Sequence, residues 1–213
     1  MNRIAETDLV PSRESLRDGI QAKFKSFEDH GIQTLENLRR ELNNTKRREM
    51  LAHLTGISQD YLVLLRREVE GYFPKPCPLR DLDWVSAEDV AKIESVGIKN
   101  TAMIVAGGYA SFSTEGSSGL PGIAPDVWKT IVAVSGLVRI QWVSPTFART
   151  LVVAGYDTAA VVAAAEPFAL DKAISRVNAE THFFKGRIGL RDVHRLIASA
   201  RFLIQWDCVR SNE

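Results

Sequence analysis

The chain has 213 residues, of which 45% are apolar and 25% are charged, with 27 Lys and Arg against 26 Asp and Glu. This composition excludes a disordered chain and a strongly basic nucleic-acid coat protein, and the length suits one large domain or two of about 100 residues. The two cysteines, Cys77 and Cys208, are too few for a four-ligand zinc or iron–sulfur site. We therefore expect a folded protein with reduced thiols and no cofactor.

The sequence contains no pattern that targets it to a membrane. Glu6 and Asp8 stand where a signal peptide has its apolar core. The most apolar stretch, residues 151–165, is interrupted by Gly155 and Asp157 and is too short to span a bilayer. The sequence therefore predicts a cytoplasmic protein that does not interact with membranes.

Apolar residues recur at helical spacing along most of the chain, so the predicted fold class is all-α. The predicted helices cover residues 34–40, 46–55, 59–70, 87–96, 126–138, 145–153, 158–165, 171–179 and 190–206. Three prolines make residues 72–78 a stiff connector, and the Ser- and Gly-rich residues 111–119 are a second predicted connector. The apolar run 103–106 is compatible with a short strand. We expect two modules, residues 1–110 and 111–213.

One sequence phrase occurs twice. Trp84-Val85-Ser86 and Trp142-Val143-Ser144 each precede a helical pattern that ends in a glycine 13 positions after the Trp. Gly97 and Gly155 each begin a second shared phrase, in which an apolar residue follows the glycine and a Thr stands three or four positions after it. Gly31 begins a third copy of this phrase. A glycine there ends one helix, and a following Thr caps the next. The sequence therefore predicts a helix, a tight turn and a helix three times, with both Trp side chains filling joints between helices.

A third phrase lies at a fixed distance from these glycines. Gly56-Ile57-Ser58 follows Gly31 by 25 residues, and Gly122-Ile123-Ala124 follows Gly97 by the same 25 residues. Each phrase introduces a predicted helix, and the Pro125 that comes next suits a first helical turn because its missing N–H costs nothing there.

These phrases resemble helix-hairpin-helix proteins and, in their order, the bacterial family of domain of unknown function 4332 over roughly residues 20–200. The resemblance implies tandem helix-hairpin-helix-like (SAM-domain-like) repeats of short helices. Such modules usually bind the DNA backbone, because a glycine turn lets the main chain approach a phosphate and the next helix offers free N–H groups. The candidate contact residues are Gly56, Ile57, Ser58, Gly122, Ile123 and Ala124. The two Trp turns lack this glycine and are expected to be packing joints.

The C-terminal part of the chain is the most basic. Residues 131–213 hold 10 basic and 7 acidic side chains. The candidate phosphate contacts in it are Lys185, Arg187, Arg191 and Arg195. The three arginines are spaced by four, so they form one stripe if that segment is helical. A solvated helix face is the alternative interpretation of the same pattern.

No arrangement of residues typical of catalysis was found. The four histidines, His30, His53, His182 and His194, lack metal-ligand spacing. His30 replaces an apolar repeat position and is expected to be partly buried. A nucleophile elbow and a phosphate-binding Walker loop are also absent. The sequence therefore predicts a non-enzymatic protein without a small-molecule substrate, which binds DNA without sequence preference or, alternatively, serves as a protein-interaction adaptor built from helical repeats.

Overall fold

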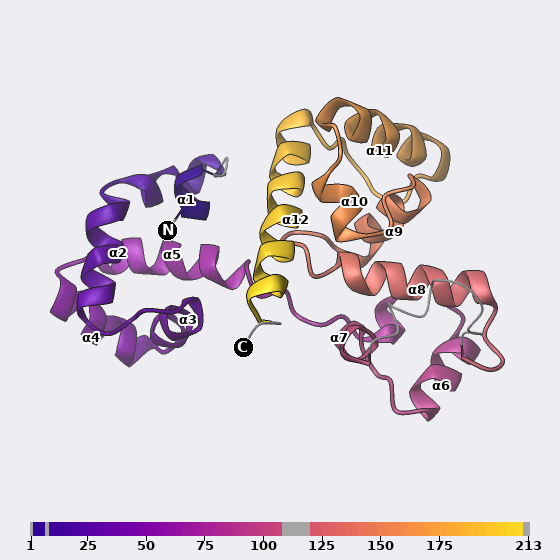
Figure 1. The fold of residues 1–213 in the computed structure, drawn as a ribbon, viewed down its shortest axis with the longest axis horizontal. Coiled ribbons are helices and arrows are strands. Elements are labelled where there is room, and N and C mark those ends of the chain that lie inside the picture. The colour runs from indigo at the N-terminus through magenta and orange to yellow at the C-terminus, as the bar shows by residue number, and fades with distance from the viewer. Residues whose placement is uncertain (1, 7–8, 108–119, 211–213) are drawn as a thin grey trace. The chain divides into compact units, whose positions relative to one another are not determined.

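The computed structural model describes residues 2–6, 9–107 and 120–210, and in these ranges the secondary structure is helical apart from one isolated bridge between Pro78 and Asn100 (Figure 1). The all-α prediction is therefore confirmed. The chain forms two compact units, residues 1–73 and residues 74–213, each with its own core.

Among its described residues, unit 1 contains five α-helices and one 3₁₀ helix. They are α1 (Asn2–Glu6), η1 (Pro11–Arg17), α2 (Ile20–Asp29), α3 (Leu35–Asn43), α4 (Thr45–Thr55) and α5 (Gln59–Glu70). The helix α5 packs against α3, α4 and η1, and its Leu62 and Leu65 are fully buried. This places α5 at the centre of the first core.

The described part of unit 2 contains seven α-helices and one 3₁₀ helix. They are η2 (Leu79–Asp81), α6 (Ala87–Ser95), α7 (Thr101–Ala106), α8 (Pro125–Leu137), α9 (Pro145–Val153), α10 (Ala159–Ala163), α11 (Pro167–Thr181) and α12 (Leu190–Arg210). The helix α8 contacts α7 and α9, whereas α12 contacts α10 and α11 (Figure 1). One continuous core of buried side chains joins all of these elements, and buried residues of the turns between them, such as Ile98, Ile123 and Ile140, belong to it.

Hydroxyl and amide side chains set where most of these helices begin. In each case the side-chain oxygen just before the helix accepts a hydrogen bond from a backbone N–H of the first turn, which leaves fewer unpaired donors there. The capping residues are Thr34, Asn44, Ser58, Ser86, Asn100, Ser144 and Thr158. Glu166 does the same for α11, accepting from two N–H groups. For this reason α11 begins at Pro167, four residues before the predicted start at Asp171.

Each predicted helix corresponds to a helix of the structure, but the strand at residues 103–106 is wrong. Those residues lie in α7, because Asn100 caps a helix there through a hydrogen bond from the Met103 N–H. Four apolar residues in a row have no period of their own, so periodicity cannot distinguish a strand from a short helix. The helices α1, η1, α2, η2 and α7 lie outside the predicted helix ranges, although the glycine turns at Gly31 and Gly97 predict a helix ending where α2 ends and a helix beginning where α7 begins.

The two compact units divide in the proline-containing connector. Residues 72–78 contain no helix, as predicted, and the division follows Phe73. Ile93 of α6 and Ile104 of α7 are fully buried in the same core as Ile131 of α8, so these helices belong to unit 2. The predicted module boundary between residues 110 and 111, and the predicted connector 111–119, lie outside the described residues.

Left-handed residues connect the helices in two kinds of turn. Gly31, Gly97 and Gly155 have φ values of 81°, 91° and 88°. Gly56 and Gly122 have φ values of 68° and 82°, and each lies two residues before the N-cap position of the next helix, α5 or α8. Trp142 also has a φ of 68°, one of two non-glycine residues with positive φ in the described chain. The turn before α9 therefore has the backbone of a glycine turn without its glycine.

Candidate nucleic-acid interface

The Gly56 turn lies in unit 1 and is largely satisfied by its own polar groups. The Gly56 amide donates to the Ala52 carbonyl at 2.9 Å, and the side chain of Ile57 is 7% exposed. Ser58 Oγ accepts from the Tyr61 amide at 3.3 Å. A hydroxyl therefore already serves the start of α5, where a phosphate would have to bind.

The Gly122 turn lies in unit 2 and is more open at the helix start. Ile123 is buried at 7% exposure, but Ala124 provides no side-chain cap for α8. The Lys92 Nζ of α6 donates to the Gly122 carbonyl at 3.1 Å. The same ammonium lies 2.8 Å from Glu88 Oε1, which raises the pKa of Lys92 and offsets part of its charge. This turn thus combines an uncapped helix N-terminus with a partly neutralised cation.

The basic candidates of the C-terminal part occupy a loop and a helix start. The helix α12 begins at Leu190, so Arg187 precedes it and the predicted continuous stripe is interrupted. Gly186, at φ 99°, and the loop that follows turn the chain before the helix. Lys185 and Arg187 are exposed and have no ion-pair or hydrogen-bond partner among the described residues. Arg191 is exposed in the first turn of α12.

Arg195 is packed rather than free. Its side chain is 13% exposed, and its Nη1 lies 3.6 Å from Asp192 Oδ1. Its guanidinium carbon lies 4.2 Å from the ring centroid of Trp142. Such a stacked guanidinium mainly contributes cation–π and packing energy. Of the four basic candidates, Arg195 is therefore part of the fold.

Trp84 and Trp142, the two equivalent Trp residues, each form a cation–π contact with an arginine from a later helix. The guanidinium carbon of Arg149 in α9 lies 5.3 Å from the Trp84 ring and 4.3 Å from the Phe183 ring. Trp84 is half-buried and packs against the core, whereas Trp142 is 43% exposed. The two Trp joints therefore share their sequence and their arginine contact but differ in how much indole faces solvent.

Trp142 also borders a hollow of about 330 Å³ that sequence reasoning missed. Residues from the α8–α9 turn, α9, the α11–α12 loop and α12 line it, among them Trp142, Phe147, Phe184, Ile188, Asp192 and Arg195. The Phe147 and Phe184 rings meet edge to face with centroids 6.0 Å apart. A sequence signal for this turn existed: Trp142-Val143-Ser144-Pro145 parallels Gly122-Ile123-Ala124-Pro125 residue by residue.

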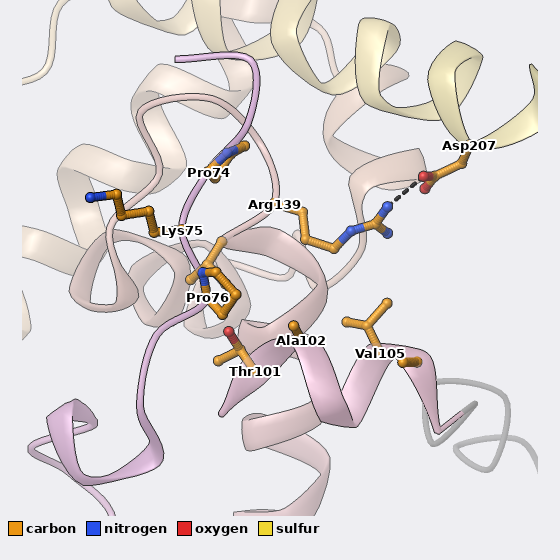
Figure 2. Close-up of a pocket in the computed structure, with 10 residues that line it drawn as sticks. Pro74, Lys75, Pro76, Thr101, Ala102, Val105, Arg139 and Asp207 are labelled. Carbon is orange, nitrogen blue, oxygen red and sulfur yellow. Dashed lines mark hydrogen bonds and ion pairs between the residues drawn. The ribbon is translucent and has the colours of Figure 1, made fainter. Parts of the chain in front are cut away.

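A larger cavity of about 940 Å³ lies between the start of unit 2, α7 and the end of α12 (Figure 2). Figure 2 shows two of its lining residues, Arg139 and Asp207, pointing toward each other, and they form an ion pair. Thr101 Oγ1 accepts from the Cys77 amide at 3.0 Å. Arg139, Asp207 and the Thr101 hydroxyl are thus engaged in contacts of the fold, and none of the lining residues belongs to the predicted interface.

Within the described ranges, no three or more His, Cys, Asp or Glu residues lie close enough together to hold a metal ion. Burial, and then Asp81, raises the pKa of the Cys77 thiol, which makes it less reactive. His30 is exposed, contrary to expectation, because it ends α2 and its Nδ1 lies 2.7 Å from the Ser26 carbonyl.

None of the helices in the described ranges combines the length and the hydropathy that a membrane crossing requires.

Comparison with known proteins gives one match. The model of the family described as domain of unknown function (DUF4332) matches residues 83–203, from just before Trp84 into α12. The search of curated proteins and the search of solved structures returned no match. The family match covers more than half of the chain and most of unit 2. The chain therefore belongs to the DUF4332 family.

Proposed function

We propose that this chain is a non-enzymatic protein that binds the backbone of nucleic acid, DNA above all, without sequence preference. The observation that carries the proposal is a pair of exposed cations, Lys185 and Arg187, which lie in the glycine-containing loop before α12 and have no partner in the part of the chain that the structure describes. Arg191, exposed in the next turn, extends the positive surface. A phosphate that binds such cations releases condensed counterions, which drives binding without reading bases.

The proposed modules are tandem helix-hairpin-helix-like repeats. In unit 2 the Trp84 turn, α6, the Gly97 turn and α7 follow one another as the Trp142 turn, α9, the Gly155 turn and α10 do. The shared order of turn, capped helix, left-handed glycine and capped helix supports two copies of one module.

The Gly122 turn is the proposed second contact. The first N–H groups of α8 lack a side-chain cap, and a helix N-terminus attracts anions through its partial positive charge. Lys92 adds a cation at the Gly122 carbonyl, although Glu88 competes for it. The Gly56 turn is the weaker candidate because Ser58 already caps α5.

The test is fluorescence anisotropy with labelled duplex DNA at about 50 and 200 mM salt. We expect binding that weakens steeply with salt, and a double variant, Lys185→Gln with Arg187→Gln, that lowers the salt slope by roughly two and weakens binding uniformly across sequences. The matched control is Lys99→Gln with Lys172→Gln, which removes the same charge from two exposed positions, one just before α7 and one on α11.

Two outcomes would overturn this proposal. One is the absence of binding at low salt up to tens of micromolar protein, since the backbone contribution is strongest there. The other is an equal loss in the control variant, because that would show a general charge effect. In a separate variant, Ala124→Asp should weaken binding if α8 receives a phosphate, since the new carboxylate occupies the same N–H groups.

A protein-interaction adaptor is the second proposal, and one surface feature favours it. Met50 and Leu54 lie four residues apart on α4 and are 58% and 55% exposed. Adjacent exposed apolar side chains on one helix face are typical of docking surfaces. If DNA does not bind, we expect the double variant Met50→Gln with Leu54→Gln to associate more weakly with a protein partner than the wild type does. Sedimentation of the chain together with that partner measures the association.

A further inference from the structure

We infer that the hollow beside Trp142 binds an unpaired base of single-stranded nucleic acid. This inference rests on the proposed function and specifies it further, because it names the form of nucleic acid that this face of unit 2 prefers. It is carried by the conformation and exposure of Trp142, by the lining of the hollow and by the cations beside it.

Trp142 stands where the fold would be better served by glycine. Its φ of 68° lies in the left-handed region that L-residues adopt only with strain, and the corresponding turn positions Gly56 and Gly122 avoid that strain. The indole is 43% exposed, so burial alone does not account for it. Strain of this kind is concentrated at sites that bind or react.

The hollow has the size and the lining for a flat aromatic ring. Its volume of about 330 Å³ lies at the lower end of small-ligand sites. Trp142, Phe147 and Phe184 supply aromatic surface, and Arg195 supplies a guanidinium plane. Aromatic rings and arginine planes are the groups on which proteins stack unpaired bases. Asp192, also in the lining, is an acceptor for a base N–H such as the N3–H of thymine.

Two exposed cations, Lys185 and Arg187, are close in sequence to residues that line the hollow. Phe184 and Ile188 line it, and Lys185 and Arg187 lie between them in the same loop. A strand with one base in the hollow can therefore place its neighbouring phosphates on these two side chains. A base inside a duplex is stacked and paired, so the same hollow cannot receive it without extrusion. We expect a preference for single strands.

The experiment compares a labelled oligothymidine with a duplex of equal length, using the full chain at about 50 mM salt. The wild type should bind the single strand more tightly than the duplex. Trp142→Gly keeps the left-handed backbone and removes the ring, so it should weaken single-strand binding about tenfold, as loss of a stacking side chain does, and leave duplex binding unchanged. Trp142→Asn, which also tolerates this conformation, is the second variant should the first unfold.

Phe168→Ala is the matched control, because Phe168 is an aromatic residue of α11 with 67% exposure that does not line the hollow. It should bind both probes as the wild type does. Circular dichroism melting curves verify that each variant is folded before binding is measured.

Three results would overturn the inference, and they are distinguishable. Equal affinity for both probes, unchanged in Trp142→Gly, removes the base site and leaves the backbone proposal standing. Absence of binding to either probe removes the proposed function as well. Binding of a peptide of alternating Glu and Leu that displaces the oligothymidine and requires Trp142 assigns the hollow to a protein partner instead.

Discussion

Single residues with positive φ decide where this chain turns. Gly97 ends α6 at a φ of 91°, and a Cβ added there would meet no atom within 4 Å. Substitution is therefore penalised by backbone conformation alone, without a steric clash. Trp142 adopts the same region with a Cβ and bears that penalty. The residue type at such a position thus separates turns that are relaxed from turns that are strained.

At this scale we predict opposite effects for two glycine substitutions. Gly97→Ala should destabilise the protein by about 1–2 kcal/mol, because the left-handed region is unfavourable for alanine. Gly136→Ala should stabilise it by about 0.5–1 kcal/mol, since Gly136 lies inside α8 and a Cβ there also meets no atom within 4 Å. Urea denaturation measures both, and destabilisation by Gly136→Ala would contradict the backbone explanation.

Residue identity also explains where single-position expectations failed. His30 was expected to be partly buried because repeat copies have apolar residues there, yet Val96 at the matching position is itself 57% exposed. The last residue before a left-handed glycine belongs to the helix end, where the side chain points away from the core. Sequence alignment of the repeats identified the position but not its burial.

At the scale of elements, α3 and α5 are joined by a polar link as well as by apolar packing. Arg39 Nε donates to Glu70 Oε1 at 2.6 Å, and Asn43 Nδ2 donates to the same oxygen at 2.5 Å. The Arg39 guanidinium also lies 4.4 Å from the Phe73 ring. These contacts fix the end of α5 just before the chain leaves unit 1.

The link makes the stability of unit 1 depend on pH in one direction. The hydrogen bond from Arg39 holds the pKa of Glu70 below its ordinary 4.5. A carboxyl group whose pKa is lower in the folded state stabilises the protein at pH values above its pKa in the unfolded state. This stabilisation is lost as the pH falls through its pKa in the folded state. The melting temperature should therefore fall as pH decreases below about 4.5, and Glu70→Gln should reduce this fall. Glu49→Gln, at an exposed position on α4 with no ion pair among the described residues, should leave the pH profile unchanged.

At the scale of the whole molecule, the chain has two cores that share no residue. The first includes Leu42, Leu62 and Leu65, and the second includes Ile93 and Ile131. Each cluster is a closed set of buried apolar side chains, which is the condition for independent folding of a domain. The family match begins at residue 83, inside unit 2.

We predict that a chain beginning at Pro74 folds on its own. Its circular dichroism should be helical and its thermal unfolding cooperative, since its core is complete. A chain beginning at residue 120 is the control and should not fold cooperatively, because it lacks α6 and α7, whose Ile93 and Ile104 are fully buried in that core. Cooperative unfolding of the shorter chain would contradict the assignment of α6 and α7 to unit 2.

The sequence by itself determined the helical class, the main helices, the Thr caps of α3 and α10, the glycine turns and the family. The third predicted Thr cap is wrong, because Asn100 and not Thr101 caps α7. These features depend on local chemistry: apolar spacing, hydroxyl caps and residues that accept left-handed backbone are all visible in a few neighbouring positions. The segment 103–106 shows the limit of this reasoning, because it has no period and only its cap and its packing on α8 make it helical.

Only the tertiary structure decided which half of the chain α6 and α7 join, that Arg195 lies on Trp142 and not in a free stripe, and that a hollow opens beside that ring. Each of these depends on side chains that are distant in sequence, such as Trp142, Phe184 and Arg195, meeting in space. Local sequence patterns indicate which interactions a residue can make. Tertiary packing decides which neighbours it contacts, and it leaves Lys185 and Arg187 exposed to a partner.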